Sequence, residues 1–223
     1  MKKICALILS LLYVASASAQ WTQITSNNVK GTYKYDALVY TGTSVLMNSE
    51  GGVQRSTDNG ETWALSINGL DTTNLSVSNL VYIPSRNELW LLSNGKIFKS
   101  TNDGVLWSHV PLTGTISPFI WPNRLGRVNN RLLAVCQEYD SGLGMNVSRF
   151  IYSDNGTSWD YGADISTGDS WFEFVNEFNN KLLVFTNNND NPSKFWYTYD
   201  GIIVAQLPMT GISGDPDIDI ESI

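Results

Sequence analysis

The chain has 223 residues, of which 42% are hydrophobic and 16% are charged, so it is long enough to bury a substantial core. Its 14 basic and 21 acidic residues give a net charge of −7. This acidic balance argues against nucleic acids and anionic membrane surfaces as partners.

Residues 1–19 have the three parts of a secretory signal peptide. Two lysines follow the initiator methionine, residues 4–14 are apolar, and residues 17–19 read Ala-Ser-Ala before Gln20. The apolar run is too short to span a bilayer, so no membrane insertion is expected. The short leader is of a bacterial kind. We therefore expect a secreted, periplasmic or cell-surface protein.

The mature chain, residues 20–223, would be more acidic than the precursor and would hold one thiol. Loss of Lys2 and Lys3 leaves 12 basic and 21 acidic residues, a net charge of −9. Cys5 is removed with the leader, and Cys136 ends the apolar run 132–136. We expect Cys136 to be a small buried hydrophobic residue, and we expect core packing rather than a disulfide to stabilise the fold.

Short β-strands separated by Gly, Asn, Asp and Ser make up most of the mature chain, and no segment outside the leader has a helical period. The strands fall into four groups of four. They are predicted at 36–40, 44–48, 52–56 and 62–66; 79–83, 88–92, 96–100 and 106–110; 119–124, 131–137, 149–153 and 158–162; and 172–177, 181–186, 194–199 and 202–207.

One motif recurs between the third and fourth strands of these groups. Its copies are residues 56–63 (Ser-Thr-Asp-Asn-Gly-Glu-Thr-Trp), 100–107, 152–159 and a shortened 198–201, and their glycines, at positions 60, 104, 156 and 201, are 44, 52 and 45 residues apart. A repeat of this length built from strands and turns is typical of a radial array of β-sheets. Asp or Asn accepts backbone hydrogen bonds in the turn, and Gly adopts positive φ without strain.

The pattern S-x-D-x-G-x-x-W resembles the Asp-box, or BNR repeat, of sialidase-like β-propellers. The first copy matches fully, the second has Asn102 in place of Asp, the third has Tyr152 in place of Ser, and the fourth is one residue short. The resemblance implies a structural turn on the face away from the ligand. The structural residues would be Ser56, Asp58, Gly60, Trp63, Ser100, Asn102, Gly104, Trp107, Asp154, Gly156, Trp159, Asp200 and Gly201.

The expected fold is therefore all-β, a β-propeller of four-stranded antiparallel blades with about four blades present. The blades are predicted near residues 33–66, 78–110, 118–162 and 171–207, and residues 215–223 would start a further blade. We expect the chain to be the N-terminal part of a propeller of six to eight blades. A compact four-bladed propeller, closed by residues 21–24 or by a C-terminal strand, is the alternative.

In propellers of this kind, ligands gather on loops that enter the first strand and join the second and third strands. Residues 138–147 and 187–193 are predicted to be polar loops of this kind. Tyr139, Trp171, Asn189 and Trp196 are the candidate ligand-binding residues, with Trp121 as a further aromatic platform, because amides and aromatic rings suit hydroxyl-rich ligands such as sugars. Packing between blades is the alternative role for the tryptophans.

Catalytic and metal-binding residues are less clearly marked. Asp36, Glu138, Asp169 and Asp190 lie in or beside the predicted ligand loops, but their spacing singles out no glycosidase pair. Asp215, Asp217, Asp219 and Glu221 would share one strand face, which makes calcium a candidate ligand there. The solvated entry of a strand is the alternative, and no cofactor is expected. His109, the single histidine, has no metal partner in the sequence.

These features favour a binding or scaffold module for a glycan or a protein, without chemistry. The alternative is the N-terminal part of a secreted glycoside hydrolase, sialidase-like or xyloglucanase-like. The arginine pattern expected of a sialidase is not present. A third hypothesis, an assembly-factor propeller like those serving photosystem II, has no specific motif in its favour.

Overall fold

Four antiparallel β-sheets follow one another along the chain, and each is built from four consecutive strands. The computed structural model describes residues 38–49, 51–73, 75–167, 171–188 and 191–207. The strand orders are β1-β2-β3-β4, β5-β6-β7-β8, β10-β11-β12-β13 and β14-β15-β16-β17, with the two-residue β9 added at the edge of the third sheet. The predicted all-β class and the four-stranded antiparallel blades are confirmed.

The strands have the following bounds. Blade 1 contains β1 (Leu38–Tyr40), β2 (Val45–Ser49), β3 (Gly52–Ser56) and β4 (Ala64–Leu65). Blade 2 contains β5 (Val77–Ile83), β6 (Glu88–Ser93), β7 (Lys96–Ser100) and β8 (Ser108–Val110), with a single 3₁₀ turn at Pro84–Arg86. After β9 (Thr113–Gly114), blade 3 contains β10 (Trp121–Val128), β11 (Arg131–Asp140), β12 (Met145–Ser153) and β13 (Ser158–Thr167). Blade 4 contains β14 (Trp171–Phe178), β15 (Lys181–Asn188), β16 (Asn191–Thr198) and β17 (Val204–Leu207).

The second and third strands of blades 3 and 4 are longer than the sequence predicts. The polar loop expected at 138–147 is wrong, because β11 continues to Asp140, β12 begins at Met145, and Glu138 pairs with Val147. The loop expected at 187–193 is also too long, because β15 ends only at Asn188 and β16 already begins at Asn191. A polar run resembles a loop in the sequence, but at the end of these blades the backbone of such residues stays paired in the ladder.

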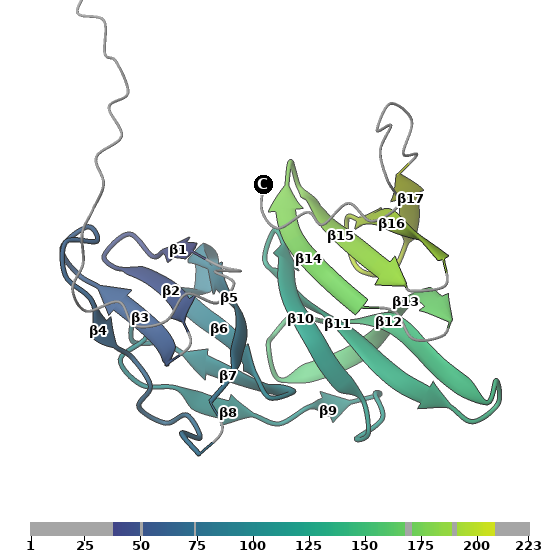
Figure 1. Ribbon diagram of the computed structural model, residues 1–223, viewed down its shortest axis with the longest axis horizontal. Coiled ribbons are helices and arrows are strands. Elements are labelled where there is room, and N and C mark those ends of the chain that lie inside the picture. The colour runs from purple at the N-terminus through teal and green to yellow at the C-terminus, as the bar shows by residue number, and fades with distance from the viewer. Residues whose placement is uncertain (1–37, 50, 74, 168–170, 189–190, 208–223) are drawn as a thin grey trace, which may run out of the picture.

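Consecutive blades pack face to face around their first strands (Figure 1). The first strands contact one another in order, β1 with β5, β5 with β10 and β10 with β14, so the first strand is the innermost of each blade. Three buried hydrophobic clusters fill the junctions between blades 1 and 2, 2 and 3, and 3 and 4. Each blade is therefore stabilised by the neighbours it packs against, as in other repeat proteins.

The first two Asp-boxes form the same hydrogen-bonded turn. Ser56 Oγ accepts the N–H of Gly60 at 2.8 Å, and Asp58 Oδ1 accepts the N–H of Thr62 at 2.9 Å. The second box repeats both bonds, from Gly104 to Ser100 at 3.0 Å and from Leu106 to Asn102 at 3.0 Å. Hydrogen bonds from the side chain and backbone of Thr62, with a smaller one from Ser56, lower the pKa of Asp58 to about 2.

The third and fourth boxes form a turn that is one residue shorter. Asn155 Oδ1 accepts the N–H groups of Thr157 and Ser158, at 2.8 and 2.9 Å, and the fourth box has the same pattern at Asp200. The expected role of Asp154 is therefore corrected by one position. Its carboxylate binds Arg131 instead, with Nε and Nη2 at 2.6 and 2.9 Å. Ser153, not Tyr152, takes the role of the box serine, because its Oγ accepts the N–H of Gly156.

A recurring set of hydrogen bonds, here called the inter-blade latch, ties each later box to the end of the preceding blade. At the first junction the side chain of Ser66 donates to Gly104 O, and the indole and backbone N–H of Trp107 donate to Ser66 O and Asn68 O at 3.0 and 2.9 Å. The second and third junctions use the bonds from Thr115 N to Trp159 O at 3.1 Å and from Ala163 N to Gly201 O at 2.9 Å.

The box glycines meet two requirements at once. The backbone φ angles of Gly104, Gly156 and Gly201 are +81°, +76° and +79°. Residues other than glycine rarely adopt such values. A Cβ atom at each would also lie closer than 3.0 Å to a second-strand side chain of the preceding blade, namely Leu46, Trp90 and Leu133. The glycine thus forms the turn and allows the neighbouring blade to approach.

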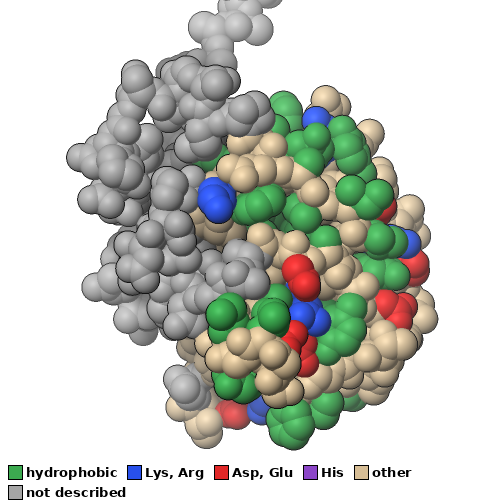
Figure 2. Space-filling view, turned by 90° about the vertical axis from the view of Figure 1, so that its right-hand side faces the viewer, with side chains coloured by type: hydrophobic (Ala, Val, Ile, Leu, Met, Phe, Trp, Pro, Cys, Tyr) green, Lys and Arg blue, Asp and Glu red, His purple; other side chains and the backbone are tan. Residues whose placement is uncertain are grey.

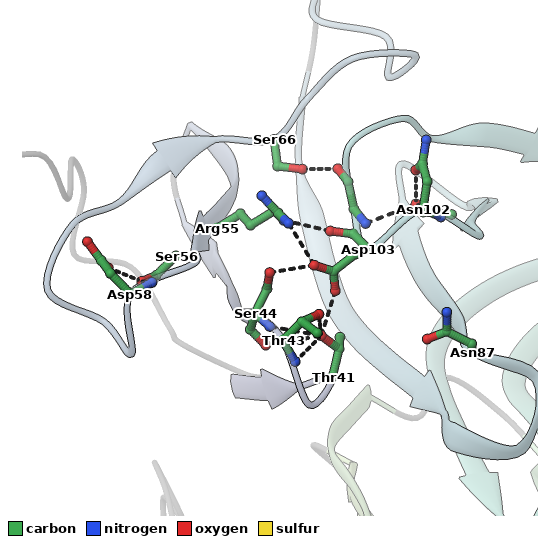
Figure 3. A network of polar contacts seen from close by, with 12 residues as sticks. Thr41, Thr43, Ser44, Arg55, Ser56, Asp58, Ser66, Asn87, Asn102 and Asp103 are labelled. Carbon is green, nitrogen blue, oxygen red and sulfur yellow. Dashed lines mark hydrogen bonds and ion pairs between the residues drawn. The ribbon is translucent and has the colours of Figure 1, made fainter.

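A polar network adds to the latch between blades 1 and 2 (Figure 3). Asp103, in the second box, accepts hydrogen bonds from the hydroxyls of Thr41 and Ser44, and its Oδ2 lies 2.6 Å from Nη2 of Arg55. Burial alone would raise the pKa of Asp103, but the bonds from Ser44, Thr41 and Arg55 together lower it.

The two buried box tryptophans give a matched test of the latch. The indole N–H of Trp107 has an acceptor, whereas that of Trp159 is buried without a hydrogen-bond partner in the part of the chain that the structure describes. Both rings are almost fully buried, so Trp→Phe removes similar volume from each. We expect Trp107→Phe to lower the free energy of unfolding by about 1–2 kcal/mol more than Trp159→Phe. Urea unfolding measures both, and equal losses would contradict the role of the indole bond.

Asp103 gives a pH-dependent test. Its folded-state pKa is lowered, so its contribution to stability is present above the ordinary Asp pKa of 3.8 and is lost as the pH falls through the lower folded value. We expect Asp103→Asn to lower unfolding free energy at pH 7 by about 1–3 kcal/mol, since hydrogen bonds to a charged acceptor are lost. The difference from the wild type should shrink as thermal unfolding is measured from pH 5 toward pH 2.5. A stability difference between Asp103→Asn and the wild type that does not change with pH would contradict a stabilising role for the charged carboxylate.

Candidate ligand-binding site

Charged side chains gather at the end of blade 3 that lies away from the Asp-box. Glu138 and Asp140 are on the last part of β11, Arg149 is on β12, and Tyr161 and Asp164 are on β13. In register, Leu132 of β11 lies opposite Ser153 of the box, whereas Asp140 lies opposite Met145 at the other end. We call these five residues the blade-3 cluster, and the end of the blades where they lie the upper face.

Arg149 is at the centre of the blade-3 cluster. Its Nη1, Nη2 and Nε atoms lie 3.5, 3.9 and 3.2 Å from carboxylate oxygens of Glu138, Asp140 and Asp164. The side chains of Arg149 and Glu138 are only 16% and 15% exposed, whereas that of Asp164 is 63% exposed. The cluster therefore has a fixed, largely buried base and an acidic rim that faces solvent.

Tyr161 connects the cluster to the segment that enters blade 3. Its hydroxyl donates to the carboxylate of Glu138, with both oxygens at 3.1 Å, and accepts the N–H of Ser117 at 2.8 Å. The guanidinium of Arg149 lies 5.0 Å from the centre of the Tyr161 ring. Burial is the largest cause that raises the pKa of Tyr161, and the Glu138 carboxylate also raises it. Tyr161 thus stays protonated and holds Glu138 in place.

Blade 3 and the segment that enters it also carry exposed aromatic side chains. Phe119 is 88% exposed and Trp121 is 57% exposed, and both follow Ser117 in the same segment. Tyr139, between Glu138 and Asp140 in β11, is 65% exposed. A Cβ atom on Gly95, in the β6–β7 turn of blade 2, would meet the Trp121 ring at 2.5 Å, so the ring rests on that turn. Figure 2 shows a face on which acidic and basic side chains adjoin one another between hydrophobic ones.

The structure describes some of the residues singled out in the sequence and not others. Glu138 and Tyr139 lie together on the upper face. Trp196 packs at the edge of the cluster between blades 3 and 4, and its indole N–H donates to Thr186 Oγ1 at 3.3 Å, which fits the inter-blade alternative. Trp171 begins β14, but its side chain is not among those described. The remaining candidates, Asp36, Asp169, Asn189, Asp190, Asp215, Asp217, Asp219 and Glu221, lie outside the described residues.

Sequence reasoning missed four members of the blade-3 cluster: Asp140, Arg149, Tyr161 and Asp164. One signal was present, since Glu138 and Asp140 are two residues apart and so share a face if the strand continues. The pairing of Arg149 with Asp164 depends on register shifts between β12 and β13, at Ser148/Arg149 and Arg149/Ile151. Such bulges cannot be placed from one sequence.

Two reactive residue types have ordinary structural surroundings. Cys136 is fully buried, and this burial raises the pKa of its thiol well above the usual value, which agrees with the expected hydrophobic role. His109 packs edge-on against Phe98, with ring centres 5.6 Å apart. Within the described ranges, no group of three or more His, Cys, Asp and Glu side chains is arranged to hold a metal ion. No helix among those residues is long and apolar enough to cross a membrane.

Solved structures with the same fold belong to larger proteins. The chain is similar to the GH74 enzyme of Niastella koreensis, with 18% identity and a TM-score of 0.51 over 74% of this chain and 27% of that one. It is also similar to PorZ, a bacterial surface component of the type-IX secretion system of Porphyromonas gingivalis (13% identity, TM-score 0.52, 79% and 21% covered). A third match is the extracellular domain of BT4673, a putative hybrid two-component system from B. thetaiotaomicron (12% identity, TM-score 0.51, 78% and 22% covered).

These similarities establish the β-propeller fold and leave the activity open. The chain spans only 21–27% of the length of the three proteins, and all identities are below 20%. No protein-family profile matches the chain, and no curated protein matches it in sequence.

A double-mutant cycle tests the central ion pair of the blade-3 cluster. Arg149→Gln leaves the largely buried carboxylate of Glu138 without its cation, and we expect a loss of about 2–3 kcal/mol in unfolding free energy. Combining it with Glu138→Gln removes that uncompensated charge, so the double variant should be more stable than the sum of the single losses predicts. Urea unfolding of the four proteins gives the coupling energy. Additive losses would show that the two side chains do not act together.

Proposed function

We propose that the chain is a β-propeller module that binds a glycan on the upper face of blade 3 and does no chemistry on it. The observation that carries this proposal is the joint presence of exposed aromatic rings and a rigid acidic rim at the end of the blade opposite the Asp-box. Sugars present hydroxyl donors at their edges and apolar C–H groups on their faces. Carboxylates and aromatic rings complement these two features.

The residues divide into two roles. Asp164 and Asp140 offer acceptor oxygens to hydroxyl groups, while the exposed ring of Tyr139, the residue before Asp140 in β11, offers an apolar surface on the other face of that strand. Arg149 and Tyr161 hold the carboxylates in place from below. A site whose polar groups are already fixed loses little conformational entropy when a ligand binds, which favours affinity.

A location outside the cell agrees with this proposal. The first 19 residues have the composition of a secretory leader. Two of the proteins with similar folds are described as a bacterial surface component and as an extracellular domain. A binding module at the cell surface or in the periplasm would meet glycans there.

Glycoside hydrolysis is the second candidate, and one observation favours it. Three carboxyl groups, of Glu138, Asp140 and Asp164, converge on Arg149, and glycosidases use paired carboxyl groups. The fold similarity to a GH74 enzyme is compatible with this role. A hydrolase would release reducing sugar from a glycan that it binds, and Glu138→Gln would abolish the release while leaving the fold intact. A binding module would bind without turnover.

Removal of one exposed ring tests the binding surface. We expect Tyr139→Ala to weaken binding of a neutral oligosaccharide by about five- to thirtyfold, because a stacking ring contributes on the order of 1–2 kcal/mol. The matched control is Phe178→Ala, which removes a ring that is 68% exposed at the end of β14, on the Asp-box side. Calorimetric titration with soluble β-glucan and mannan oligosaccharides measures both variants. Equal losses, or no binding by the wild type across the panel, would contradict the proposal.

A further inference from the structure

We infer that this site selects uncharged sugars and discriminates against sugars that carry a carboxylate. The inference rests on the proposed glycan binding and specifies its ligand class. It depends on whether a ligand can reach the guanidinium donors of Arg149, the cation of the blade-3 cluster. In an arginine that recognises an acidic ligand, the guanidinium must have donors free to pair with the incoming carboxylate.

The guanidinium of Arg149 is enclosed by side chains of this chain. Each of its three nitrogens lies 3.2–3.9 Å from a carboxylate oxygen of this chain, its Nε atom is buried, and its central carbon lies 5.0 Å from the centre of the Tyr161 ring. Its side chain is 16% exposed, so a ligand meets the acidic rim before it meets the cation. The arginine therefore acts as a positioning residue for Glu138, Asp140 and Asp164.

The charge of the cluster points the same way. Three carboxylates and one guanidinium leave a formal charge of −2 on these side chains, within a chain whose net charge is −7. A carboxylate brought to this rim would be repelled and would gain no charged donor. A neutral sugar in the same position gives hydroxyl donors to Asp164 and Asp140 and has no such penalty. Excluding the competing ligand in this way is a common source of specificity.

The test compares two oligosaccharides that differ only by oxidation at C6, a neutral oligoglucoside and the corresponding oligoglucuronide. Both are titrated into the mature wild-type protein at low ionic strength. We expect the neutral ligand to bind at least tenfold more tightly, and the difference to narrow at high salt, because salt screens the repulsion. Equal affinities, or tighter binding of the oligoglucuronide, would overturn the inference while the proposed glycan binding stands. Binding of neither ligand would overturn both.

One substitution assigns the selectivity to this cluster. Asp164→Asn removes one negative charge and leaves the Nε of Arg149 without its carboxylate, so the ratio of the two affinities should fall at least threefold. The matched control is Glu61→Gln, which removes one exposed negative charge from the first Asp-box, on the opposite face. The control should keep the wild-type ratio. An unchanged ratio in Asp164→Asn, or an equal change in both variants, would overturn the assignment to the blade-3 cluster.

Discussion

The close approach of each Asp-box to the preceding blade is the constraint on which the rest of this structure depends. A box glycine takes a positive φ and lets a second-strand side chain such as Leu46 or Trp90 lie where a Cβ atom would otherwise be. The latch bonds then join the same turn to the end of the neighbouring blade. The turn, the core packing and the register between blades are thus determined together at one end of each blade. The side chains at the upper ends are therefore free to vary.

The upper end of blade 3 carries charged side chains. Its three outer strands extend well beyond the hydrophobic cluster that joins blades 2 and 3, so their last residues can be charged without disturbing the core. Glu138 lies two residues beyond the buried Cys136 on the same strand face, and Arg149 pairs with Cys136 across the ladder. The change from apolar to ionic side chains within one strand face therefore follows from the length of the strands. It places a rigid polar site above a rigid core.

The sequence predicted the parts of this structure that local chemistry determines. Strands 52–56 and 96–100 have the predicted bounds, since each ends in an Asp-box whose Ser, Gly and Trp can be recognised one by one. It failed where the outcome depends on register between strands. Asp154 and Asn155 are adjacent acceptors, and only the hydrogen bonds show that Asn155 closes the turn. Likewise, Arg149 meets Asp164 only because β12 and β13 are bulged, and a polar strand end looks like a loop when it is read alone.

The central claim is that the two ends of the blades have different tasks, structural at the Asp-boxes and ligand-binding at the upper face. Hydrogen exchange of the mature protein, with and without a saturating neutral oligosaccharide, tests it most directly. The account predicts that the ligand slows exchange in segments 117–121 and 138–149 and leaves the box turns at 56–63 and 100–107 unchanged. Slower exchange confined to the box turns, or spread equally over both ends, would contradict it.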